Sequence, residues 1–79
     1  MEYSYNDLVN DLEIGHEIEF THLNCDYSIS HNDQGWHLYC VDTGNNQSFK
    51  DVGDLLNNGK ILGKSLRDIW NSVNIRSIF

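Results

Sequence analysis

Two His-x-x-Cys units are the part of this 79-residue chain whose residue types and spacing could do chemistry. They pair His22 with Cys25 and His37 with Cys40. Four nitrogen and sulfur ligands at short spacings suit tetrahedral zinc. A thiol beside an imidazole is also the starting point of nucleophilic cysteine catalysis. These four residues therefore suggest an alternative function, that of a small metal- or thiol-dependent domain.

The strand pattern around the second unit argues against both chemistries. Residues 36–41 alternate between apolar and polar side chains. Side chains three apart on a strand point to opposite faces, so His37 and Cys40 should not converge on one metal ion. A buried Cys40 beside Tyr27 is expected to have a raised thiol pKa, which disfavours nucleophilic attack. We therefore expect no metal, no cofactor and no enzymatic activity.

Charge is distributed unevenly along the chain. No lysine or arginine precedes Lys50, whereas nine carboxylates do, and the net charge is −7 at pH 7. Five basic residues are too few to neutralise the phosphates of a nucleic acid, so direct nucleic-acid binding is not expected. We expect no signal peptide, because the first residues lack its basic and apolar regions, and no membrane span, because no apolar run approaches the roughly 20 residues that a span requires. We therefore expect a cytoplasmic protein without membrane contact.

The acidic half of the chain predicts a docking surface. Asp7 and Asp11 lie one helical turn apart in an expected first helix. Glu17 and Glu19 should project from the adjacent strand, and Asp26 from the next one. If helix and sheet edge are neighbours, the five carboxylates form one negative surface for a basic protein, such as a nucleic-acid-handling protein that the chain inhibits. The alternative is a solvated face that only confers solubility.

Three less polar side chains are expected on the polar face of the sheet. They are His37, Tyr39 and Val41. They would supply the centre that a protein interface normally contains. They could equally pair two copies of the chain, so the sequence leaves monomer and homodimer open.

Helices are predicted from their caps and from apolar periodicity. Three Ser-x-x-Asp sequences stand before apolar runs and are typical of helix N-termini; they begin at Ser4, Ser48 and Ser65. We expect helices over residues 5–13, 52–56 and 66–73, the second capped by Asp51 rather than by Ser48.

Between the first two helices the pattern is that of strands. We expect strands at residues 16–23, 27–31, 36–41 and 46–49. Turns at 24–25, 32–35 and 43–44 would align Phe20, Ile29, Leu38 and Phe49 in one central row. The sequence therefore predicts a single α+β domain over residues 1–79. It would contain an N-terminal helix, a four-stranded antiparallel meander sheet and two C-terminal helices packed on one sheet face.

Three segments carry a resemblance to other proteins. They read NDQGWHLY at residues 32–39, SFKD at 48–51 and GKSLRDIW at 63–70. They resemble a group of small uncharacterised acidic proteins of Gram-positive bacteria and their phages. The shared residues lie in turns, caps and the core, so the resemblance names no catalytic residue. It implies an origin in a phage or mobile element, which favours an inhibitor or host-takeover role.

Overall fold

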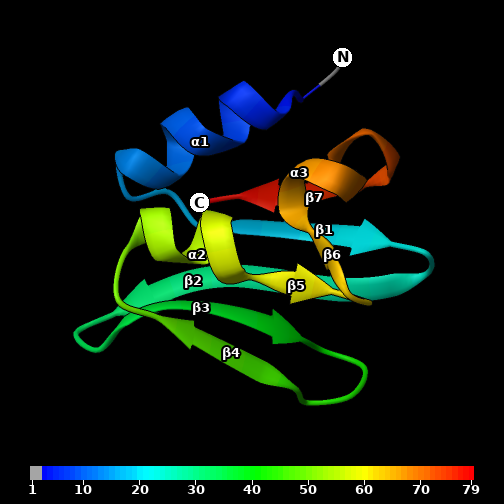
Figure 1. The fold of residues 1–79 in the computed structure, drawn as a ribbon. Helices are drawn as coiled ribbons and strands as arrows, with labels where there is room; N and C mark the ends of the chain where they lie inside the picture. Colours follow the sequence, from blue (N-terminus) through cyan, green and yellow to red (C-terminus); the bar gives the residue numbers. More distant parts are fainter. Residues whose placement is uncertain (1–2) are drawn as a thin grey trace.

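The chain folds into two layers, shown in Figure 1 for the computed structural model, which describes residues 3–79. One layer is a five-stranded sheet of β1 (Ile18–His22), β2 (Cys25–Asn32), β3 (Gly35–Cys40), β4 (Asn46–Phe49) and β7 (Asn74–Ile78). The other layer contains α1 (Tyr5–Glu13), α2 (Val52–Asn58), α3 (Leu66–Ile69), the 3₁₀ helix η1 (Trp70–Ser72) and a hairpin of β5 (Lys60–Ile61) and β6 (Lys64–Ser65). The protein is therefore α+β. Glu2, one of the nine carboxylates before Lys50, lies outside the described residues.

The expected four-stranded meander is wrong, because the sheet has five antiparallel strands in the order β4-β3-β2-β1-β7. β7 returns from the C-terminal region and pairs with β1, so that the first strand of the chain is flanked on both sides (Figure 1). Its five residues carry no local pattern strong enough to distinguish a strand from a loop. The partner that makes them a strand lies at the other end of the sequence, and a long-range pairing of this kind leaves little trace in local sequence.

The expected third helix also proves shorter. α3 keeps its capping box, in which Ser65 Oγ accepts from the Asp68 N–H at 3.2 Å. The α-helix then ends after one turn and continues as η1, and Val73 is already extended. The apolar spacing that suggested a longer helix instead places Ile69 and Trp70 in the core. Packing against the sheet therefore decides where this helix ends.

Two of the three strand registers differ from those expected, each by two residues. The β2–β3 register is as expected, with Ile29 opposite Leu38. Between β1 and β2, Phe20 faces Tyr27 instead of Ile29. The reason is the turn, which is formed by Leu23 and Asn24 with φ of 50° and 65°. Two successive residues in this left-handed region are typical of the tight turns that fit the twist of a hairpin.

The β3–β4 connection is longer than expected. Leu38 faces Gln47, and Phe49 faces Trp36, because residues 41–45 form the loop instead of residues 43–44 alone. Side chains alternate with a period of two along a strand, so a shift of two residues keeps every side chain on its expected face. Each of these strands therefore turns the expected side chains toward the core, although two of the expected registers are wrong.

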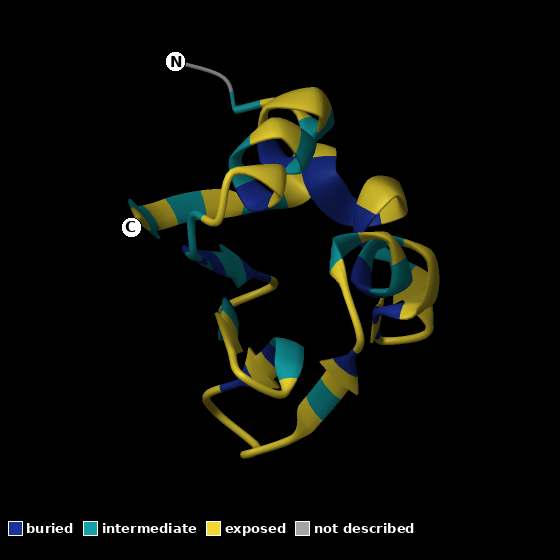
Figure 2. Ribbon diagram, turned by 90° about the vertical axis from the view of Figure 1, so that its left-hand side faces the viewer, coloured by how far each residue is buried: buried dark blue, intermediate teal, exposed yellow. Residues whose placement is uncertain are grey.

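The core lies between the Phe20 side of the sheet and the covering layer. The largest fully buried side chains come from both layers: Phe20, Ile18, Ile29 and Leu38 from the sheet, and Leu8, Leu12, Leu55 and Leu66 from the helices. In Figure 2 the helices and strands carry bands of buried and exposed residues, as expected of elements with one covered side.

The β5–β6 hairpin is attached to the main sheet through a side chain. The Gln47 amide of β4 donates to the Lys60 carbonyl at 2.7 Å and accepts from the Lys60 N–H at 3.0 Å. These two bonds reproduce the pattern that a neighbouring strand would make. The turn of the hairpin uses Leu62 and Gly63 at φ of 54° and 80°.

Gly35 should be the glycine on which the fold depends most. Its φ is +124°, and a Cβ at this position would lie 2.2 Å from the Phe49 carbonyl oxygen. We expect Gly35→Ala to lower the free energy of unfolding by more than about 2 kcal/mol, because backbone strain and a clash with backbone add together. Gly63→Ala is the matched control. Its φ is +80° with nothing within 4 Å of the added Cβ, so strain alone should cost about 1 kcal/mol. Equal losses in chemical denaturation would contradict this account.

Asp54 should make the stability of α2 depend on pH. Its carboxylate accepts from the Lys50 N–H at 3.1 Å and from the Asn58 amide at 2.6 Å, and these bonds hold the Asp54 pKa below its ordinary value of 3.8. A lowered pKa in the folded state stabilises the protein above the unfolded pKa, and this stability is lost as the pH falls through the folded pKa. We expect Asp54→Asn to reduce the free energy of unfolding at pH 7 and to have a diminishing effect below about pH 4. Denaturant titrations of both proteins across this range would show it.

Candidate functional site

The face of the sheet opposite the core is left open by the helices, whose buried side chains all join the core cluster on the Phe20 side (Figure 1). We call this the open sheet face. Strand alternation assigns to it Glu19, Thr21, Asp26, Ser28, Ser30, His37, Tyr39, Asn46, Ser48, Asn74 and Ser77. Its residues are polar almost without exception, so water can solvate it.

The β3–β4 side of the open sheet face is held by a polar network around His37. Its Nε2 lies 3.1 Å from Asn32 Oδ1, and its Nδ1 lies 3.0 Å from Ser48 Oγ. An amide oxygen only accepts, so Nε2 carries the hydrogen, and in the neutral ring the Ser48 hydroxyl donates to Nδ1. Ser48 Oγ also accepts from the Asn46 amide at 3.2 Å. Both ring nitrogens of His37 are thus occupied by structural partners.

The β1–β2 side of the open sheet face is acidic. Asp26 accepts from the Thr21 hydroxyl at 2.8 Å, and Arg76 Nη1 lies 3.6 Å from its carboxylate. The Asp42 carboxylate accepts from the Asp26 N–H at 3.0 Å, so it adds a second negative charge at the same place. Glu19 lies between Ser28 and Ser77 on the neighbouring strands.

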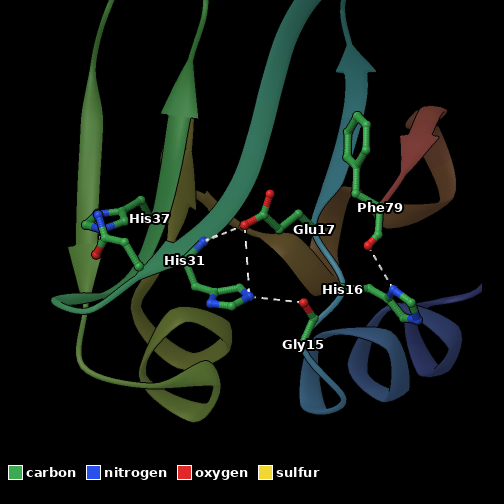
Figure 3. A network of polar contacts seen from close by, with 7 residues as sticks. Gly15, His16, Glu17, His31, His37 and Phe79 are labelled. Atoms are coloured by element: carbon green, nitrogen blue, oxygen red, sulfur yellow. Dashed lines mark hydrogen bonds and ion pairs between the residues drawn. The ribbon is translucent and has the colours of Figure 1, made fainter.

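Glu17 lies at the end of the sheet, in the polar cluster of Figure 3. Its carboxylate accepts from the His31 N–H at 3.3 Å and lies 3.9 Å from His31 Nε2. The same Nε2 donates to the Gly15 carbonyl at 3.0 Å, and the His31 ring packs on Trp36 at 4.5 Å between centroids. Glu17 therefore fastens the α1–β1 loop to β2 while its carboxylate stays partly exposed.

The same cluster joins the segment before β1 to the residue after β7. His16 Nδ1 donates to the Phe79 carbonyl at 2.9 Å (Figure 3). The Phe79 N–H donates to the Glu17 carbonyl at 2.7 Å. These bonds extend the β1–β7 pairing beyond the strands themselves.

The two carboxylates of α1 belong to a different part of the molecule. Asp7 closes the capping box with Ser4 at 3.0 Å in both directions, and Asp11 accepts from the Tyr3 hydroxyl. Burial and the neighbouring Asp11 raise the pKa of Tyr3, so this phenol stays protonated as the donor. α1 belongs to the covering layer (Figure 1), whereas strand alternation puts Glu19 on the open sheet face. The structure therefore does not bring the five predicted carboxylates onto one surface.

The predicted less polar residues do lie with the acidic side of the open sheet face. Tyr39 is 39% exposed, and Val41 is 53% exposed just beyond the end of β3. The Val41 N–H donates to the Asp26 carbonyl at 2.9 Å, which places it beside that carboxylate residue. Ser28 separates Tyr39 from Glu19 in the strand order. Strand pairing therefore puts His37, Tyr39, Glu19 and Asp26 on one face of the sheet, with Val41 just beyond the end of β3.

The two His-x-x-Cys units do not converge. His22 pairs with Cys25 on the covered face, and Cys40 lies on that face too, whereas His37 is on the open sheet face. No group of three or more His, Cys, Asp or Glu side chains within residues 3–79 is placed to hold a metal ion.

The expected rise in the Cys40 pKa is wrong. Hydrogen bonds from the Thr43 hydroxyl, and from the backbone N–H groups of Thr43 and Asp42, lower the pKa of this thiol despite its burial. The donors come from a turn in which the Gly44 N–H donates to the Cys40 carbonyl at 2.8 Å. The Thr43–Gly44 sequence is the signal for this turn, but the placement of donors around the sulfur needs the structure.

Comparison with known proteins assigns neither a family nor a function to this chain. No family model, no curated protein and no solved structure matches this chain. The resemblance to small acidic proteins of Gram-positive bacteria and their phages therefore stays a prediction. Within residues 3–79, no helix has the length and apolar character needed to cross a membrane.

Proposed function

We propose that the protein is a non-enzymatic binding module that docks a basic protein on its open sheet face. The observation that carries the proposal is the charge of this surface. Glu19, Asp26 and Asp42 lie on or beside it, Glu17 borders it, and Arg76 is the basic residue that faces them. Complementary charge speeds encounter with a basic partner and disfavours acidic ones.

The centre of the proposed contact would be Tyr39 with Val41. An aromatic side chain with a polar tip is the type most often found at energetically important interface positions. Both side chains are exposed, and carboxylates lie to one side of them. This arrangement resembles the apolar centre and polar rim of protein interfaces in general.

The charge of the open sheet face also limits which kind of partner can bind. The partner is a protein rather than a nucleic acid, because the same carboxylates repel phosphates. An inhibitor that occupies the nucleic-acid-binding groove of a basic protein fits this charge, and a phage or mobile-element origin would suit that role. Asp7 and Asp11 would take no part in the contact, since they lie in the other layer.

We also propose a monomer in the cytoplasm. Two copies joined through the open sheet face would bring like charges together, which disfavours a homodimer at this surface. Cys25 and Cys40 are both free thiols, as is usual in a reducing compartment.

The proposal is tested by comparing two charge-reversal variants, one in the sheet and one in the covering layer. Immobilised protein would be incubated with nuclease-treated lysate at low and high salt, and the retained basic protein quantified. We expect retention to fall with salt and to drop at least about tenfold for Glu19→Lys, because an attractive charge becomes repulsive. Glu13→Lys is the matched control. It makes the same charge change at an exposed position in the last turn of α1, where a cation is favourable.

Two results would count against the proposal. One is equal loss of retention for Glu13→Lys and Glu19→Lys, which would indicate a response to net charge alone. The other is unchanged retention for Glu19→Lys and for Tyr39→Ala, which would place the contact elsewhere on the molecule.

A further inference from the structure

The two cysteines occupy one corner of the covered sheet face. Cys25 begins β2 opposite His22, and Cys40 ends β3 opposite Tyr27. The β2–β3 ladder continues past Cys40, since the Val41 N–H donates to the Asp26 carbonyl. Cys25 and Cys40 are therefore diagonal neighbours on the same side of two adjacent strands. Side chains in this relation lie close enough to interact.

A partly open cavity of about 160 Å³ borders one of the two thiols. It lies between the end of β3 and the β5–β6 hairpin, and its walls include Tyr27, Cys40, Thr43, Lys60, Ile61 and Leu62. Cys40 lines this cavity, and Cys25 does not. A small molecule can thus reach the neighbourhood of Cys40 although its residue surface is 8% exposed.

The two sulfur atoms have opposite surroundings. The Thr43 hydroxyl and the Thr43 and Asp42 N–H groups stabilise the Cys40 thiolate and lower its pKa. Burial, together with the Asp42 carboxylate, raises the pKa of Cys25. Because the thiolate is the nucleophile, these surroundings make Cys40 the attacking sulfur and leave Cys25 protonated.

A buried imidazole stands beside the second thiol. His22 is 6% exposed, and its Nδ1 has no hydrogen-bond partner within the described part of the chain. Buried ring nitrogens are normally paired, so an unpartnered one calls for an explanation. Its cross-strand neighbour Cys25 has the Asp42 carboxylate as the hydrogen-bond partner of its thiol, and this thiol must lose its proton before it can attack another sulfur.

We propose that Cys40 is a nucleophilic site for low-molecular-weight disulfides and that Cys25 is its resolving thiol. In the first step the Cys40 thiolate attacks one sulfur of the disulfide, the bond between its two sulfur atoms breaks, and one half leaves as a thiolate. In the second step Cys25 gives its proton to water and attacks the Cys40 sulfur, which expels the second half as a thiolate. Two cysteine thiols are oxidised, and one disulfide is reduced to two thiols.

Glutathione disulfide is the probe for the test, with acid quenching and peptide mapping by mass spectrometry. In wild-type protein we expect the earliest adduct on Cys40, followed by a Cys25–Cys40 disulfide. In Cys25→Ala the mixed disulfide on Cys40 should accumulate. At pH 7 it should form at least about tenfold faster than the adduct on Cys25 in Cys40→Ala, because the thiolate fractions differ.

Thr43 variants separate activation of the sulfur from a structural role. Thr43→Val should slow the reaction of Cys40 at pH 7 much more than at pH 10, whereas Thr43→Ser, which keeps the hydroxyl, should restore it. Early adducts mapped in the wild-type protein identify the reactive thiol even if a variant does not fold. Faster reaction at Cys25, or a Cys40 rate that rises only above about pH 9, would overturn the proposal. Failure of the wild-type protein to form the internal disulfide would overturn the role of Cys25.

Discussion

The alternation of β1 is the constraint on which the rest of the structure depends. Ile18 and Phe20 point into the core and are fully buried, while Glu19 between them points to the open sheet face. A slip of one residue would exchange these sides and bury a carboxylate without a partner, at a cost of several kcal/mol. β1 is also flanked by β2 and β7, so its register sets the positions of both neighbours. The core and the acidic surface are therefore fixed by the same strand.

The two faces of the sheet support separate chemistries. On the open sheet face, the polar network around His37 and the ion pair of Asp26 with Arg76 order side chains that a partner would meet. An ordered polar surface loses less side-chain entropy on binding than a mobile one. On the covered face, the corner that contains the two cysteines is shielded by the β5–β6 hairpin. Asp42 links the two regions, because its carboxylate accepts from the Asp26 N–H and also contacts the Cys25 thiol.

Local features were predictable from the sequence, and long-range ones were not. The α1 bounds, the Asp51 cap of α2 and the faces of the four expected strands follow from short patterns, because caps and alternation act within a few residues. β7 was missed since its strand character comes from pairing with β1, far away in the chain. The acidic site was only partly foreseen, because the sequence places α1 near β1 without showing that its carboxylates lie in the other layer. The lowered Cys40 pKa depends on how the turn after β3 folds back, which residue types alone do not reveal.

The pairing of β1 with β7 also has a consequence for biosynthesis. During synthesis β1 emerges early and β7 only after every other strand of the sheet. Until then one edge of β1 offers unpaired N–H and C=O groups beside Phe20 and Ile18, and exposed edges of this kind invite pairing with other chains. Closing so long a loop is also slow compared with forming the β2–β3 hairpin. The nascent chain is therefore most prone to aggregation in the interval before residues 74–78 leave the ribosome.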